Sequence, residues 1–329
     1  MSTAATLPLP ALPPVGRRVR AYFAPVNRAA QQPYFFDPSV SGEFSLDAPP
    51  APWIDLGWIE NFTRKSASRI GELATGSPAT AQFQVRQTID ATVSLRFKAW
   101  NKLSMALASG SEHMNLIVPA AGGTPNGSGS KGAAAVNLTA GSTATFLAMA
   151  ASDAAKFCAG SLVTVDVDYT GQTGYVGSGV FAAYVQNASA VNNDLDYVRR
   201  VSFNVARVAS VAASGTTGLS LAQPLLAGVP ASNMQVQPIC GFVDREGGNF
   251  FQEWSALFVI PGQQGDRILF HYPRLQSMAG SAEGSTTLLA PLERIALSAS
   301  YRALPVTDLN DGAQVVCFRS YLPGANTLV

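Results

Sequence analysis

A long segment of strict two-residue alternation is the clearest pattern in the chain. Between Thr80 and Ala99 the apolar side chains fall on odd positions: Phe83, Val85, Ile89, Val93, Leu95 and Phe97. The even positions are polar: Gln82, Gln84, Arg86, Thr88, Asp90, Thr92, Ser94 and Arg96. Such alternation predicts a strand with one buried face and one face turned to water or to a partner. The run is far longer than the usual strand of about five or six residues. We therefore expect either a long ribbon that builds a sheet with neighbouring chains, or two strands joined by a tight bend.

The residues around this strand carry a family pattern. The block opens with Trp53-Ile54-Asp55-Leu56-Gly57-Trp58-Ile59, and Glu72-Leu73 follows. The long strand then leads into a helical pattern from Trp100 to Ala108. In this order of features the block from Trp53 to Met114 resembles the major tail tube proteins of long-tailed bacteriophages and related injection devices.

The resemblance implies a fold and a structural role. The fold would be mainly β, a tail-tube-like β-sandwich or barrel with one short packed helix, plus an inserted small β-domain. Copies of the chain would close into hexameric rings, and the rings would stack into a tube in the virion tail after assembly in the host cytoplasm. Partners would be other copies and further tail proteins (tape measure, tail terminator and possibly a sheath). Genomic DNA would pass through the lumen without sequence-specific binding. The polar even positions from Gln82 to Arg96 would line that channel. DNA must slide along such a wall, so we expect it to lack basic clusters that bind phosphates tightly. Arg86 and Arg96 depart from this expectation.

Composition supports an assembly subunit independently of the resemblance. Charged residues make up 13% of the 329 residues, against a usual share of about a quarter. With so few charges, part of the surface can be covered by other copies instead of facing water. The 29 Gly and 21 Pro indicate a β protein with many turns. The net charge of +1 argues against a strongly basic nucleic-acid binder. The length predicts a large core and two domains.

Changes of pattern along the chain divide it into four parts. Residues 1–50 form a Pro-rich arm, 51–157 the first part of the core, 158–247 an inserted β-domain, and 248–329 the second part of the core with a C-terminal extension. Short alternating runs separated by Gly-rich turns favour the β-domain assignment.

The N-terminal arm is too aromatic to remain in water and must dock on its own core or on a neighbour. We expect it to become ordered only on a neighbour, with the arginines paired to that subunit's carboxylates. The candidate contacts are Arg17, Arg18, Arg20, Tyr34, Phe35 and Phe36. Pro8, Pro10, Pro13 and Pro14 interrupt any signal-peptide helix, and no apolar run of about twenty residues predicts a membrane span.

Residues able to carry chemistry are few. The chain has two histidines, His113 and His271, but it has no Gly-x-Ser-x-Gly nucleophile elbow whose serine a histidine could activate. Cys158, Cys240 and Cys317 are far apart and lack metal-ligand spacing, so we expect them to be small buried side chains.

Two further motifs also favour a structural interpretation. Asp166 and Asp168 share a strand face, but two carboxylates alone hold a cation poorly. Gly174 to Gly179 has the wrong order for a phosphate loop. The sequence predicts no enzyme, no cofactor and no metal. The alternative function is a baseplate or host-recognition β-sandwich that binds a receptor or glycan; a β-sandwich hydrolase would need an acid and base pair that we do not find.

Overall fold

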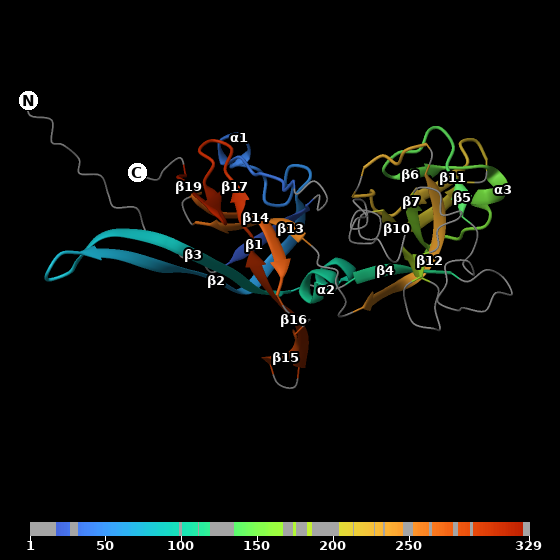
Figure 1. Ribbon diagram of the computed structural model, residues 1–329. Coiled ribbons are helices and arrows are strands. Elements are labelled where there is room, and N and C mark those ends of the chain that lie inside the picture. The colour runs from blue at the N-terminus through green and yellow to red at the C-terminus, as the bar shows by residue number, and fades with distance from the viewer. Residues whose placement is uncertain are drawn as a thin grey trace, which may run out of the picture. The chain divides into compact units, whose positions relative to one another are not determined.

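The computed structural model describes most of the chain in two compact units. The described residues are 18–26, 32–98, 101–110, 112–118, 135–166, 174–175, 183–185, 204–212, 214–226, 228–232, 234–245, 253–262, 265–278, 282–289 and 292–324. The first unit joins Met1–Gly110 with Glu253–Val329, and the second is Ser111–Gln252. Antiparallel strands dominate both units, which confirms the mainly β prediction (Figure 1).

The boundaries of the insertion differ from those predicted. The second unit begins at Ser111 instead of residue 158 and ends at Gln252 instead of residue 247. Strands β5 (Val136–Asn137) and β6 (Phe146–Ala148) explain the difference. They pair with β12 and β11 of the second unit, so backbone hydrogen bonding draws this region out of the predicted core.

The first unit contains a closed ring of antiparallel strands. Their order around the ring is β1, β2, β3, β16, β14 and β13, and the pairing of β16 with β14 closes it. Strands β15 and β19 extend the sheet from β16 and β14, and β17 pairs with β18. The bounds are β1 Val19–Pro25, β2 Ile54–Thr75, β3 Thr80–Phe97, β13 Glu253–Pro261, β14 Arg267–Ser277, β15 Ala282–Leu289, β16 Leu292–Ala303, β17 Val306–Thr307, β18 Gln314–Val315 and β19 Phe318–Leu322.

Aromatic side chains fill the interior of this barrel. The Phe23 ring lies 6.2 Å from Trp254, 6.0 Å from Phe258 and 5.7 Å from Tyr301, measured between ring centroids. All four side chains are almost fully buried. They come from β1, β13 and β16, so the ring contacts join strands that lie apart in the sequence.

Helix α2 (Lys102–Ser109) follows β3 and confirms the predicted helix. Asn101 and Ser104 form a capping box at its start, and Gly110 ends it at φ 61°, a conformation that glycine adopts without strain. The Tyr301 hydroxyl donates to the Leu107 carbonyl at 2.9 Å. This bond satisfies a carbonyl in the last turn of the helix and fixes α2 to the barrel.

The predicted N-terminal arm divides into a barrel strand and a cover. Strand β1 lies between β2 and β13, so residues 19–25 belong to the barrel. Residues 32–53, which include helix α1 (Pro38–Ser41), cover the outer face of β1, β13 and β14. Phe36 and Trp53 from this segment share a core cluster with Tyr22, Leu257 and Leu269. The described part of the arm therefore docks on its own core, and the expectation that only a neighbour orders it is wrong there.

The second unit is built on a nine-stranded sheet in the order β6-β11-β10-β7-β12-β4-β9-β8, with β5 paired to β12. Its own core cluster includes Leu147, Val163, Val165, Leu219 and Val236. The remaining bounds are β4 Glu112–Ile117, α3 Ala151–Ala154, β7 Leu162–Asp166, β8 Gly174–Tyr175, β9 Ala183–Val185, β10 Val205–Ala212, β11 Gly218–Leu221 and β12 Gln235–Arg245.

Candidate assembly surface

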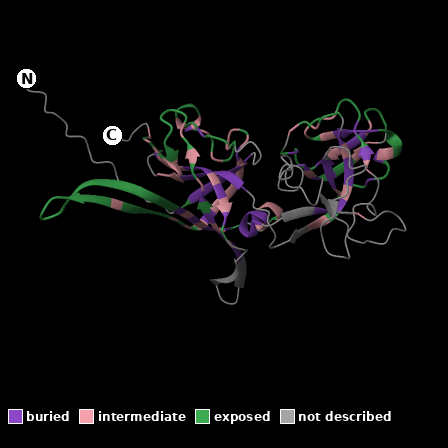
Figure 2. Ribbon diagram, in the orientation of Figure 1, coloured by how far each residue is buried: buried purple, intermediate pink, exposed green. Residues whose placement is uncertain are grey.

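Strands β2 and β3 form a hairpin that extends well beyond the barrel (Figure 1). Strand β1 pairs with β2 only as far as Ile59, and β16 pairs with β3 only from Thr92 to Phe97. Residues 66–91 therefore form a ribbon, and no third strand pairs with it within the described residues. Figure 2 shows the ribbon exposed along nearly all of its length, apart from Gly71 and from Ala91 at the barrel end. A two-stranded ribbon is only marginally stable in water, and its open edges are templates for pairing with another chain.

The predicted alternation holds only in the inner half of β3. From Ala91 to Phe97 the odd positions are buried and the even positions are partly exposed. In the ribbon the odd positions are exposed as well: Phe83 at 63%, Val85 at 51% and Ile89 at 38%. The expectation that one face packs along the whole strand is wrong there, because the body of the unit ends where β16 leaves β3.

A β-bulge in the ribbon moves the apolar side chains to a new face. Arg69 pairs with Thr88 and Ile70 pairs with Arg86, so Gln87 is the extra residue. Because Arg69 and Ile70 point to opposite faces, Thr88 and Arg86 do so too. The eight predicted lumen residues therefore do not share one face.

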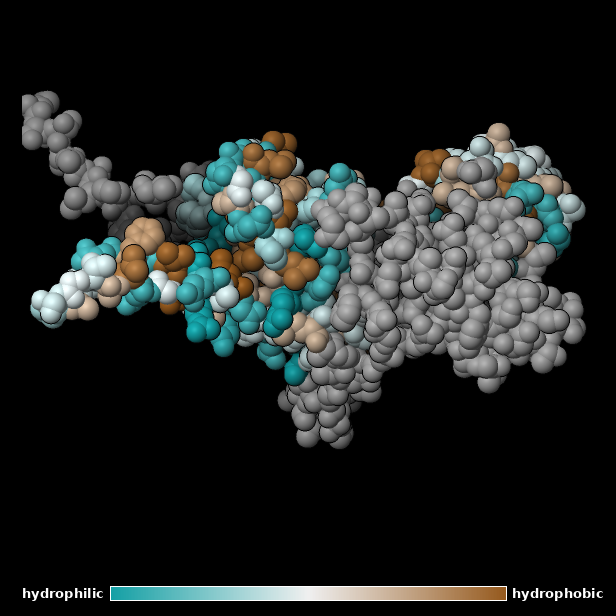
Figure 3. Space-filling model, viewed as in Figure 1, coloured by the Kyte–Doolittle hydropathy of each residue, from teal (hydrophilic) through white to brown (hydrophobic). Residues whose placement is uncertain are grey.

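Beyond the bulge, the ribbon carries an apolar face near its tip. Phe83 lies opposite Leu73 and Val85 lies opposite Gly71, so these side chains share a face. Gln84 and Glu72 share the other face and are joined by a hydrogen bond of 3.0 Å. Hydrophobic residues are visible along the hairpin in Figure 3. Sequence reasoning missed Ile70 and Leu73, since residues 64–75 of β2 show no regular alternation.

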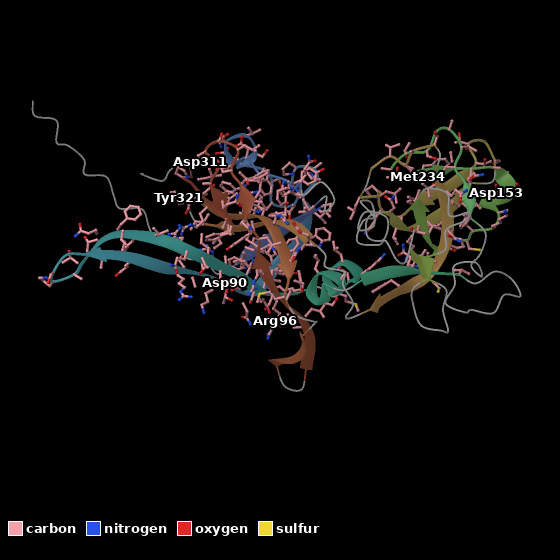
Figure 4. The ribbon with its side chains drawn as sticks, viewed as in Figure 1. Asp90, Arg96, Asp153, Met234, Asp311 and Tyr321 are labelled. Carbon is pink, nitrogen blue, oxygen red and sulfur yellow. The ribbon has the colours of Figure 1, made fainter. Side chains whose placement is uncertain are left out.

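At the barrel end of the hairpin, the outer wall is a ladder of polar side chains. Residues directly opposite one another on three adjacent strands form its rows. The rows are Glu60-Arg96-Ser298, Thr63-Ser94-Ser300 and Lys65-Thr92-Arg302. The hydroxyl oxygens of Ser94 and Ser300 lie 3.0 Å apart, and Arg302 Nε lies 3.5 Å from Asp90 Oδ1. Figure 4 marks Asp90 and Arg96 where the ribbon joins the barrel.

The polar ladder contains part of the predicted lumen strand β3 and also β16, a strand that the sequence did not assign to the lumen. It brings Thr92, Ser94 and Arg96 together, whereas Gln82, Gln84, Arg86, Thr88 and Asp90 lie outside it on the ribbon and are exposed. Ser298 and Ser300 were missed, although they are the polar positions of the alternation from Ile295 to Tyr301. The wall carries both signs of charge, for example in the pair of Lys98 with Glu60 at 3.5 Å.

The arm arginines make contacts within the chain. Arg17 lies outside the described residues, and the Arg18 guanidinium lies 6.0 Å from the Trp58 ring. Arg20 pairs with Asp55 and, at 2.7 Å, with Asp47. The hydrogen bond that Arg20 donates to the Asp55 carboxylate raises the pKa of Arg20, which is buried with this carboxylate beside it. The prediction that the arm arginines pair with a neighbour's carboxylates is therefore wrong for Arg20.

The arm aromatics anchor the cover to the barrel and leave part of it exposed. Phe36 is buried, and its N–H donates to His271 Nε2 at 3.3 Å. The Tyr34 N–H donates to Ser255 Oγ at 2.9 Å, while the Tyr34 side chain remains 46% exposed. Phe35 is 48% exposed and makes an edge contact with Phe318.

The candidate chemical residues do not come together in the described part of the chain. Burial lowers the pKa of His271 to about 4, so this histidine is neutral beneath the arm. The His113 side chain, the Asp166 side chain and Asp168 lie outside what is described, as do residues 176–179 of the glycine motif. The described residues contain no group of three His, Cys, Asp or Glu that could hold a metal. Cys158 and Cys240 are exposed and Cys317 is intermediate, so the expected burial of the cysteines is wrong.

Comparison of the chain with protein-family models and with curated proteins finds no match. No helix in the described part of the chain is long and apolar enough to cross a membrane. The surface features that stand out are the exposed ribbon (residues 66–91) and the polar ladder, and both belong to the first unit.

Proposed function

We propose that this chain is a structural subunit of a phage tail tube, which closes with other copies into hexameric rings that stack in the virion tail. The exposed ribbon carries the proposal. It exposes Ile70, Leu73, Phe83, Val85 and Ile89 and offers two open backbone edges. Large exposed apolar groups and unpaired edges are liabilities for a monomer and ordinary features of a chain that assembles.

The polar ladder supports the same function as a candidate channel wall. Serine and threonine hydroxyls alternate there with the charged side chains of Glu60, Lys65, Arg96 and Arg302. Asp90 of the adjoining ribbon lies 3.5 Å from Arg302 and partly offsets the basic charge. A wall of this kind stays hydrated and holds phosphates less firmly than a basic cluster would. The ladder thus suits a surface along which DNA slides without sequence-specific binding.

Electron microscopy of the purified chain over a range of concentrations tests the proposal. We expect rings or hollow tubes at roughly tens of micromolar, where contacts of moderate affinity become occupied. Sedimentation velocity on the same samples measures the assembled fraction. A chain that stays monomeric throughout, together with its absence from tubes in a native particle, would rule out the tube function. Monodisperse particles that bind a glycan or a receptor would instead favour the host-recognition module.

A further inference from the structure

His271 of β14 holds the backbone of the cover (residues 32–53) by a hydrogen bond that helps to fix its tautomer. The Phe36 N–H donates to His271 Nε2 at 3.3 Å, and His271 Nδ1 lies 3.3 Å from the carbonyl oxygen of Ala256. A carbonyl oxygen only accepts, so the ring proton is on Nδ1, and Nε2 carries no proton because it accepts from Phe36. The ring is therefore neutral and has one hydrogen-bond partner on each nitrogen.

A second proton on this ring can bind only at Nε2. It would set an N–H of His271 against the N–H of Phe36, and two donors cannot bond to each other. Both residues are buried, and a buried donor without an acceptor costs more than the lost bond contributed. The protonated ring and the Phe36 N–H therefore cannot stay in contact.

The imidazole ring is held in place by groups that tolerate its charge. The bond from Nδ1 to Ala256 survives protonation, because it uses the other nitrogen. The ring also stacks on Phe318, with centroids 6.0 Å apart and an interplanar angle of 19°. The face of an aromatic ring attracts a cation. Protonation should therefore move the segment that carries Phe36 and leave the ring of His271 where it is.

Residues 32–37 are the lightly held end of the cover. Their backbone bonds to the barrel come from Phe36 and from Tyr34, whose N–H donates to Ser255 Oγ at 2.9 Å. The Tyr34 and Phe35 side chains are exposed, and Phe36 supplies the one buried side chain of the six residues. Release of this segment therefore removes one large side chain from the core.

The rest of the cover has anchors that do not involve His271. Arg267 donates to the carbonyl oxygens of Gly42 and Phe44. The Tyr22 hydroxyl donates to the carbonyl oxygen of Leu46 at 2.9 Å. These bonds should keep the later part of the cover on the barrel when residues 32–37 leave it.

The surroundings of His271 are aromatic, and no charge among the described residues takes part in its titration. The rings of Phe35, Trp53 and Phe318 lie around it at 5.6 to 6.2 Å between centroids. Burial lowers the pKa of His271, and only the bond to Ala256 opposes that shift. Cys317 and Arg319 flank Phe318 and point to the other face of the sheet. The remaining titratable groups on this face and in the cover have other partners or are exposed: Arg267 and Tyr22 with the cover carbonyls, Glu253 with Arg274, Asp47 and Asp55 with Arg20, and the exposed Asp37 and Glu43.

We infer that His271 is a pH-sensitive latch of the cover: protonation at Nε2 releases residues 32–37 from the barrel and leaves the rest of the cover in place. The latch belongs to the folded first unit and does not depend on the proposed assembly.

The pH range of the latch follows from linkage. In the closed form, burial lowers the pKa of His271 to about 4. Release exposes the ring to water, where a histidine has its ordinary pKa of about 6.5. The closed form is therefore fully favoured above about pH 6.5 and becomes less favoured as the pH falls to about 4. Each pH unit in this window shifts the equilibrium toward the open form by up to about tenfold, or about 300-fold in all.

Amide hydrogen exchange across this window tests the latch, with each rate divided into the intrinsic rate at the same pH to give a protection factor. In the wild type the protection of the Tyr34 and Phe36 amides should fall by up to about tenfold per pH unit. The Phe44 N–H, bonded to the Ser41 carbonyl at 3.2 Å, and the Met278 N–H, bonded to the Ser300 carbonyl at 2.8 Å, should keep their protection.

Two variants separate the latch from other sources of pH dependence. His271→Gln supplies a neutral side-chain oxygen as acceptor and does not titrate in this window, so protection at Phe36 should no longer depend on pH. Ser255→Ala is the matched control, because it removes the acceptor of the Tyr34 N–H and no titratable group. It should lower the protection of Tyr34 at every pH and keep the wild-type pH dependence at Phe36.

The wild type alone can overturn the inference. Protection at Phe36 that stays constant from about pH 6.5 to about pH 4 would do so, whatever the variants show. An equal fall at Phe36, Phe44 and Met278 would also overturn it, because that pattern is global unfolding. A fall at Phe36 that persists in folded His271→Gln would assign the pH dependence to another group.

Discussion

Phe83→Thr should impair assembly and leave the monomer intact. Threonine keeps the β-preference of the position. Phe83 is 63% exposed in the monomer. The substitution should therefore change the free energy of unfolding by no more than about 0.5 kcal/mol, as is usual for surface positions. In the assembly the same side chain would be covered.

The magnitude follows from the exposed area. A phenylalanine side chain buries about 200 Å², so 63% corresponds to about 125 Å² still available for burial. At about 25 cal/mol per Å² that area is worth about 3 kcal/mol, of which threonine would retain about one third. A loss of about 2 kcal/mol raises the critical concentration about thirtyfold.

Pelleting of tubes across a dilution series measures this concentration, and thermal melting of the dilute chain measures the monomer. Val229→Thr is the matched control, because Val229 is 68% exposed in the second unit. An unchanged critical concentration for Phe83→Thr, or an equal rise for the control, would refute the assignment of the ribbon to the contact.

Two further predictions concern the folded monomer. Between about pH 6.5 and about pH 4, the unfolded chain binds a proton at His271 that the folded chain does not bind, because burial lowers the folded pKa to about 4. Acidification through this window should therefore reduce the free energy of unfolding by up to about 1.4 kcal/mol per pH unit. Urea titrations at several pH values should show that His271→Asn loses this part of the pH dependence. An unchanged pH dependence in the variant would contradict the assignment. Replacing residues 111–252 with a short Gly/Ser linker should leave the first unit folded, because that unit has its own core and short loop closures cost little. Loss of near-ultraviolet dichroism from the buried aromatics would show that the units depend on each other.

The sequence predicted what local periodicity controls. The buried side chains from Ala91 to Phe97 follow the alternation, and α2 lies where its Ala- and Leu-rich pattern indicates. Both depend on contacts that repeat regularly along the chain. The mainly β class follows from the same kind of evidence.

The sequence could not predict which strands pair with or pack on a given element, or at which residue that pairing stops. The bulge at Gln87 depends on pairing with β2, and in the sequence of β3 it is marked by nothing more than a polar residue at an odd position. The aromatic run in residues 32–53 has no period, so the sequence alone does not show which surface it covers. The barrel face that receives it joins β1 to β13 and β14, and residues of those two strands that contact the segment lie more than two hundred positions away from it. The polar ladder likewise joins β2, β3 and β16, which only the closed fold brings together.

The closed barrel has a consequence for the timing of growth. Pairing of β16 with β14 closes the ring, so in the described part of this sheet the open strand edges lie on the ribbon and on the terminal strands β15 and β19. A ribbon that becomes well ordered only when another chain covers it makes the first encounter of two copies the least favourable step. Later copies would meet a ribbon already held in place. We therefore expect a lag before tubes appear and rapid elongation afterwards, with short pre-formed seeds abolishing the lag. A chain built in this way can accumulate as a monomer and polymerise only where something supplies the first ring.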